Sequence, residues 1–122
     1  MATVNIYNGY SVDMLNWNFS KAAQYGIASW IHSNINIYGT NYASAYEVEM
    51  NINGAFFDDI FAGNFTTNAS GAVTGGTISA IYEQAWNGYA WVLAESFTGF
   101  SYSAVAIYNA AISGGAIGDY TD

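Results

Sequence analysis

The sequence predicts a single α+β domain in which a curved antiparallel meander of about five or six strands carries helices on one face. Three observations indicate this fold. The length of 122 residues suits one domain with one core. Apolar and polar residues alternate from Ile35 onward and are interrupted by turn dipeptides, as in antiparallel strands. Apolar residues also recur at helical spacing towards both ends of the chain.

The N-terminal region is expected to form a short strand and then a helix. Residues 2–7 alternate like a strand, and the "NGYS" that follows predicts a turn. Ser11 is a suitable N-cap for a helix over residues 11–25, which Gly26 would end. The apolar residues that define this helix are Val12, Leu15, Phe19 and Ala22.

Turn signals divide the middle of the chain into strands. The dipeptides Asn53-Gly54 and Asn87-Gly88 predict two-residue hairpin turns, because both central residues of a type I′ turn need a positive φ. A longer turn is expected at residues 68–71. The predicted strands lie near residues 35–39, 45–52, 55–66, 72–84 and 89–98.

The C-terminal region predicts a second helix, near residues 103–112, on the same face of the sheet as the first. Ser103 is its expected cap, and Gly114-Gly115 would stop it. Residues 116–122 are expected to form a short tail, so that residues 1–122 make one domain.

The first hairpin predicts an acidic patch. A two-residue turn at Asn53-Gly54 places Glu49 directly opposite Asp58, and Glu47 shares their face. Like charges directly opposite each other destabilise a strand pair. A Ca²⁺ ion, which takes about six to eight oxygen ligands, would relieve this repulsion. Glu47, Glu49 and Asp58 are therefore candidate calcium ligands; the alternative is that the three carboxylates point into water.

The second hairpin predicts two sheet faces that both need cover. A two-residue turn at Asn87-Gly88 gives one face of large aromatic residues and one of small residues. Helices can cover one face, whereas the other must fold over itself, bind a flat apolar ligand or meet another subunit. The same register puts Glu83 and Glu95 on opposite faces, which excludes them as a close pair.

No catalytic motif is present, and a non-enzymatic protein is expected. The chain has no cysteine, no "GxSxG" elbow and no glycine-rich phosphate loop. A strand pair can hold two carboxyls at the separation of about 5–5.5 Å used by retaining glycosidases. The sequence, however, indicates no pocket that would raise the pKa of a general acid.

Composition limits the partners and the compartment. The net charge of −8, with one basic residue against nine acidic ones, argues against nucleic-acid binding. No apolar run approaches the roughly 20 residues of a membrane span, and the N-terminus does not read as a cleaved signal peptide. The near absence of Lys and Arg, the absence of Cys, and the abundance of Gly, Asn, Ser and Tyr look like those of bacterial proteins exported in one step through a C-terminal signal. We therefore expect an extracellular protein, secreted without a cleaved N-terminal signal.

Several segments resemble the HasA-type haemophores, the secreted haem-acquisition proteins of Gram-negative bacteria. The matching pieces are "VNIYNGYSVDMLNW", "HSNIN" followed by "IYG", "FAGNFT", "GGTISAI" and "FTGFSYSAVAIYNA". The resemblance implies the fold, the type I export route, and haem held between a loop histidine and a loop tyrosine. His32 lies in the segment that resembles the histidine loop, whereas Thr74-Gly75-Gly76 occupies the place of the tyrosine. Tyr38 and Tyr42 are the candidate replacements for this ligand.

The function that we expect is that of a self-assembling extracellular subunit, in a fibre or a surface matrix, that responds to calcium. Only 8% of the residues are charged and 18% are aromatic, so the chain has more apolar surface than a small core can bury. Assembly would use the aromatic sheet face and edge strands that carry no guarding lysine. The alternative is a haem carrier that uses His32, and a second alternative is a carbohydrate-active or other small-ligand-binding module.

Overall fold

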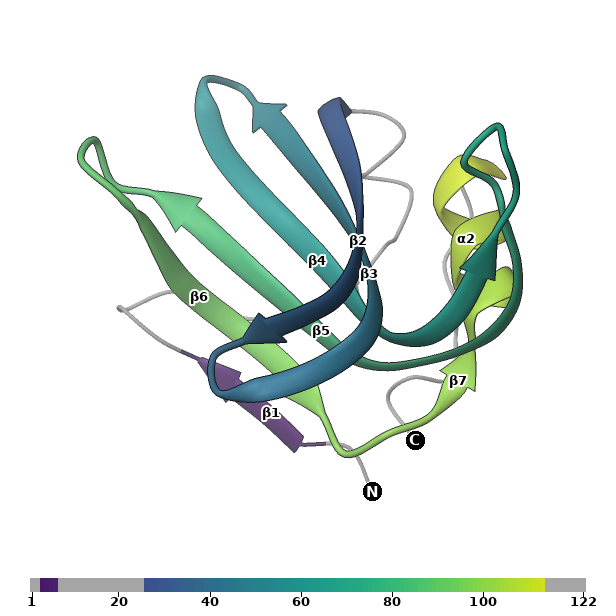
Figure 1. Cartoon of the computed structure of the whole chain (residues 1–122). Coiled ribbons are helices and arrows are strands. Elements are labelled where there is room, and N and C mark those ends of the chain that lie inside the picture. Colours follow the sequence, from purple (N-terminus) through teal and green to yellow (C-terminus); the bar gives the residue numbers. More distant parts are fainter. Residues whose placement is uncertain (1–2, 7–25, 114–122) are drawn as a thin grey trace.

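The computed structural model describes residues 3–6 and 26–113, which form an antiparallel sheet and one short helix (Figure 1). The strands are β1 (Thr3–Ile6), β2 (Gly26–Ile37), β3 (Thr40–Ile52), β4 (Ala55–Thr67), β5 (Val73–Trp86), β6 (Trp91–Thr98) and β7 (Tyr102–Ser103). The helix α2 covers Ala104–Ser113. The helix predicted over residues 11–25 and the tail predicted over 116–122 lie outside the described residues.

The sheet has the order β1-β6-β5-β4-β3-β2, with β7 paired to β5, and every pairing is antiparallel. This confirms the predicted meander. The predicted C-terminal helix is also confirmed: Ala106 donates its N–H to Ser103 Oγ over 3.2 Å, so Ser103 caps α2 as expected.

Strand β2 is much longer than its predicted counterpart. The sequence predicted a strand only near residues 35–39, whereas β2 begins at Gly26. Asn34 has a φ of 52°, which interrupts the regular alternation of side chains. A search for alternating apolar and polar residues therefore does not detect the part of the strand that precedes Asn34. The turn that follows was also missed, because Tyr38 occupies a position with a φ of 49° that usually favours Asn or Gly.

The predicted register of the first hairpin is confirmed. Ile52 pairs with Ala55 and Glu49 with Asp58. Asn53 and Gly54 have φ values of 54° and 89°, as a type I′ turn requires.

The predicted register of the second hairpin is wrong. Trp86 pairs with Trp91, so the loop has four residues, 87–90. Asn87 does not adopt a positive φ; its Oδ1 instead accepts hydrogen bonds from the backbone N–H groups of Tyr89 and Ala90, each over 2.9 Å. A register shift next to Glu83 then places this residue directly opposite Glu95. The exclusion of Glu83 and Glu95 as a close pair was therefore also wrong.

Two hydrophobic clusters lie on opposite faces of the sheet. The helix face packs against α2, and its buried residues are Phe61, Phe65, Ile78, Ile81, Phe97, Ala104 and Ile107. The hairpin face lies on the other side, and its buried residues are Ile37, Ala45, Ile60, Ala62, Ala80 and Tyr82.

The β2–β3 hairpin curls over the hairpin face until its turn reaches β5, as Figure 1 shows. Tyr38 in this turn bonds to Gln84, and Tyr42 at the start of β3 bonds to Tyr82. Of the three predicted ways to cover the second face, the described residues therefore show a sheet that folds over itself.

Two glycines allow β4 and β5 to approach closely where the sheet bends. A Cβ atom on Gly63 would lie 2.2 Å from the carbonyl oxygen of Thr77, and one on Gly76 would lie 2.3 Å from that of Asn64. Gly76 also has a φ of 95°. In the "GG" of "GGTISAI", Gly76 is thus the residue that the close backbone contact requires, whereas Gly75 is not.

Candidate functional site

The candidate site is a row of polar side chains that crosses the hairpin face. Strand alternation places Glu47 and Glu49 of β3 on this face, and the pairing of Glu49 with Asp58 and of Asp58 with Gln84 continues the row into β4 and β5. We call the following set the polar row: His32, Tyr38, Glu47, Asp58 and Gln84.

Hydrogen bonds connect the polar row at both ends. His32 Nε2 lies 2.7 Å from Glu47 Oε1. At the other end, Gln84 Nε2 donates to Asp58 Oδ2 over 3.0 Å, and the hydroxyl of Tyr38 donates to Gln84 Oε1 over 2.7 Å. These hydrogen bonds thus connect the curled β2–β3 hairpin to the central strands of the sheet.

Glu47 and Asp58 form a carboxyl pair in the middle of the row. Burial raises the pKa of Asp58 to about 8, and the hydrogen bond and negative charge of Glu47 add to this effect. Burial opposes ionisation of Glu47 as well, but hydrogen bonds from Asp58 and His32 outweigh it and lower the pKa of Glu47. Around neutral pH the pair therefore holds one proton, on Asp58.

The hydrogen-bond pattern of Asp58 agrees with this proton. Asp58 is only 2% exposed, and its Oδ1 has no hydrogen-bond partner while both carboxyls are ionised. A proton on Asp58 gives the pair the donor it needs for a hydrogen bond to ionised Glu47.

Tyr38 is held in place from both ends of its side chain. Its ring centroid lies 5.5 Å from that of Tyr82, and its hydroxyl bonds to Gln84. Burial, followed by the nearby charge of Asp58, raises the pKa of the Tyr38 hydroxyl. The phenol therefore stays a hydrogen-bond donor over the whole physiological range.

The predicted calcium ligands are only partly brought together. Glu47 contacts Asp58, and Glu49 lies opposite Asp58 across the strand pair. Over residues 3–6 and 26–113, no three His, Cys, Asp or Glu side chains are grouped so that they could hold a metal ion. Calcium binding by Glu47, Glu49 and Asp58 stays a prediction.

The residues predicted to bind haem are each engaged by another side chain. His32 lies within β2 rather than in the loop that the resemblance implies, and it contacts Glu47. Tyr38 bonds to Gln84, and the hydroxyls of Tyr42 and Tyr82 lie 2.6 Å apart. Haem ligation by His32, with Tyr38 or Tyr42, stays a prediction.

A second acidic row lies on the helix face, and sequence reasoning missed it. Asp59 pairs with Glu83, and Glu83 pairs with Glu95. Complete burial of Asp59, together with the charge and hydrogen bond of Glu83, raises the pKa of Asp59 well above its usual range. The pairing of Glu83 with Glu95 depends on the register shift beside Glu83, and no turn signal in the sequence predicts that shift.

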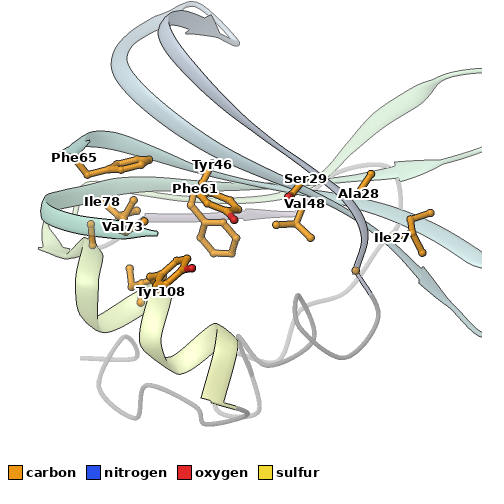
Figure 2. A pocket seen from close by; sticks show the side chains of 13 residues that line it. Ile27, Ala28, Ser29, Tyr46, Val48, Phe61, Phe65, Val73, Ile78 and Tyr108 are labelled. Atoms are coloured by element: carbon orange, nitrogen blue, oxygen red, sulfur yellow. The ribbon is translucent and has the colours of Figure 1, made fainter. Parts of the chain in front are cut away.

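The helix face also contains a cavity of about 340 Å³ between the sheet and α2 (Figure 2). Tyr46 and Tyr108 meet edge to face in its wall, with ring centroids 6.1 Å apart. The other labelled lining residues in Figure 2 are Ile27, Ala28, Ser29, Val48, Phe61, Phe65, Val73 and Ile78. His32 contacts Glu47 on the hairpin face, so this cavity does not support haem ligation by His32.

Comparisons of the chain with protein-family models, with curated proteins and with solved structures give no match in any of the three. In the part of the chain that the structure describes, no helix is both long and apolar enough to cross a membrane. The function therefore has to be argued from the site and the surface of this chain.

Proposed function

We propose that the protein is a subunit of a self-assembling extracellular structure and that copies of it join through β2. The observation that carries this proposal is the surface of this strand. β2 has 12 residues and lies at the edge of the sheet. Ile27 is 55% exposed, and Trp30 and Ile31 are each 44% exposed.

Such an edge favours pairing with another chain. An edge strand offers unpaired backbone N–H and C=O groups, and proteins usually protect it with Lys, Pro, charged side chains or a short length. β2 contains no Lys, Arg, Asp, Glu or Pro, and its one titratable side chain, His32, contacts Glu47. Within the described residues, β2 therefore lacks the charged side chains, the prolines and the short length that usually protect an edge strand.

Exposed apolar side chains on both sides of β2 add to this tendency. Trp30 pairs with Glu47 and Ile31 with Tyr46, so the two side chains point to opposite faces of the sheet. A strand added to β2 would cover part of each. Burial of apolar surface contributes about 25 cal/mol per Å², in addition to the new backbone hydrogen bonds.

Two modes of pairing lead to different assemblies. Antiparallel pairing of two β2 strands is isologous and closes as a dimer. Pairing of β2 with β1 of the next copy is heterologous and, where the rotation between copies does not close a ring, continues as an open filament, which is what a fibre needs. We favour the second mode for growth, and the distribution of particle sizes distinguishes the two.

The experiment compares two lysine variants by light scattering and electron microscopy. Ile31→Lys places a charge on the β2 edge, and Tyr89→Lys places the same charge on the 92% exposed Tyr89 in the β5–β6 loop. We expect the wild type and Tyr89→Lys to form large species and Ile31→Lys to stay monomeric with an unchanged circular dichroism spectrum. A monomeric wild type, or equal assembly of both variants, would overturn it.

A second candidate function is the carriage of a small apolar ligand, which the cavity on the helix face favours. Its volume of about 340 Å³ lies within the usual range of ligand pockets, roughly 300–1,000 Å³. Val73→Phe would fill part of this space and should weaken the binding of an apolar fluorescent probe. The haem version of this function is tested separately by haemin titration: a sharp Soret band that is lost in His32→Ala would support it.

A further inference from the structure

An aromatic cluster lies next to the polar row on the hairpin face. Trp86 and Trp91 face each other across β5 and β6, with ring centroids 5.5 Å apart and planes inclined at 65°. This edge-to-face arrangement leaves Trp86 43% exposed. Phe56, which is also exposed, precedes Asp58 by two residues on the same face of β4. We call Phe56, Trp86 and Trp91 the aromatic end.

The pairing of β4 with β5 places Trp86 of the aromatic end close to the carboxyl of Asp58. Trp86 follows Gln84 by two residues, and Gln84 pairs with Asp58. Trp86 and Asp58 are therefore diagonal neighbours, a distance that large aromatic side chains can bridge. Glu49 lies on the far side of Asp58 and is partly exposed.

The electrostatic environment of the aromatic end is negative. The chain carries a net charge of −8, and over residues 3–6 and 26–113 the sequence has His32 as its one basic side chain. His32 contacts Glu47 at the other end of the polar row. A cation that approaches Trp86 thus meets carboxylates and no nearby Lys or Arg from the described residues.

We propose that the aromatic end binds a small organic cation that carries a methylated ammonium group. The group would lie over the exposed ring of Trp86, with the carboxylate of Glu49, and that of Asp58 once it has lost its proton, as countercharges.

The chemistry of the surface selects this class of ligand. The face of an indole ring attracts cations, most strongly where water is partly excluded. A neutral apolar ligand would cover the partly exposed Glu49 without offering its carboxylate a partner, which costs free energy. A hard metal ion such as Ca²⁺ is bound mainly by oxygen ligands, which the indole rings do not offer.

Binding should be linked to the proton of the carboxyl pair. The groups that face Asp58 are Glu47 and Glu49 from β3, Gln84 from β5, and Tyr38 from the hairpin turn. His32 acts on the pair through Glu47. A cation near Asp58 favours its ionised form, so binding should release a proton and become tighter as the pH rises towards 9.

The test is a calorimetric titration with choline and with its neutral isostere, in which carbon replaces the quaternary nitrogen. We expect choline to bind saturably, Trp86→Leu to weaken binding about tenfold, and Tyr89→Leu, a matched loss of an exposed aromatic residue, to leave it unchanged. Glu49→Gln should weaken choline binding and leave the isostere unaffected.

Two results would overturn the proposal. Equal binding of choline and its isostere would mean that the aromatic end is merely an apolar patch. An absence of saturable choline binding at pH 9, in wild-type protein whose circular dichroism spectrum shows that it is folded, would mean that there is no cation site. Neither result depends on whether β2 mediates assembly, because the aromatic end involves β4, β5 and β6.

Discussion

The hydroxyl of Tyr38 donates a 2.7 Å hydrogen bond to Oε1 of Gln84, and this contact fixes the turn of the β2–β3 hairpin on the fifth strand. Gln84 in turn donates to Asp58. The neutral amide therefore connects the closure of the sheet over its own face to the protonation of the buried carboxyl pair.

Removal of this hydroxyl should destabilise the protein modestly. Tyr38→Phe keeps the ring against Tyr82 and leaves Gln84 Oε1 without its donor. Because this part of the hairpin is exposed, we expect a loss of about 1 kcal/mol in the free energy of unfolding, measured by urea denaturation. An unchanged free energy of unfolding would mean that the contact does not hold the hairpin closed.

The stability should fall as the pH rises from about 4 to about 8. The pKa of Asp58 is raised to about 8 in the folded protein from a usual value of 3.8, so the folded state binds its proton more tightly than the unfolded state. This contribution is complete below pH 3.8 and is lost as the pH passes through about 8. The raised pKa of Asp59 acts in the same direction. The lowered pKa of Glu47 acts in the opposite direction, because its contribution is lost as the pH falls below its usual value of 4.5. Urea denaturation at a series of pH values measures the slope.

Asp58→Asn should remove much of this pH dependence. The amide can donate to Glu47 and can keep a side-chain contact with Gln84, so it imitates protonated Asp58 at every pH. We expect the variant to be more stable than the wild type at pH 9 and to show a flatter pH profile. If the stability of both proteins depended on pH in the same way, the proton of the carboxyl pair would not be on Asp58.

Gly63→Ala should be markedly destabilising, whereas Gly75→Ala should not. A Cβ on Gly63 would overlap the backbone of β5, but one on Gly75 would lie 3.5 Å from Thr66 Oγ1, an ordinary contact distance. We expect a loss of about 1–3 kcal/mol for the first and less than about 0.5 kcal/mol for the second, measured by thermal or urea unfolding. Equal effects would contradict the close approach of β4 and β5.

Calcium should promote assembly if Glu47, Glu49 and Asp58 bind it. Ca²⁺ would favour the ionised form of Asp58 and would compensate its repulsion with Glu49, which faces it across β3 and β4. We expect light scattering to rise on addition of millimolar Ca²⁺ and to rise less in Glu49→Gln. Sodium chloride at matched ionic strength is the control. If the protein stayed a monodisperse monomer throughout the calcium titration, this prediction would be wrong.

Local signals in the sequence predicted much of the fold but not its distant contacts. Asn53-Gly54 fixed a register that placed Glu49 opposite Asp58, because both turn residues adopt a positive φ. The same dipeptide at Asn87-Gly88 did not predict the register, since the hydrogen bonds that Asn87 Oδ1 accepts from Tyr89 and Ala90 favour a longer loop. The identity of a turn dipeptide therefore determines register only when no competing side-chain contact is available.

The candidate site was predicted in part for the same reason. Glu47 and Asp58 were found because they belong to one hairpin, where register arithmetic applies. Gln84 and Tyr38 were not found as their partners, because the curl of the sheet brings them together and no short-range pattern encodes that curl. The turn at Tyr38 also uses a residue type that turn statistics disfavour.

The two edges of the sheet are unequal: β2 has 12 residues, whereas β1 has four. A fibre built by placing β2 of each copy on β1 of the next would therefore have polarity, with a long exposed strand at one end and a short one at the other. Its two ends would grow at different rates. Short fragments of the protein's own fibres, used as seeds, should accordingly elongate asymmetrically under the microscope.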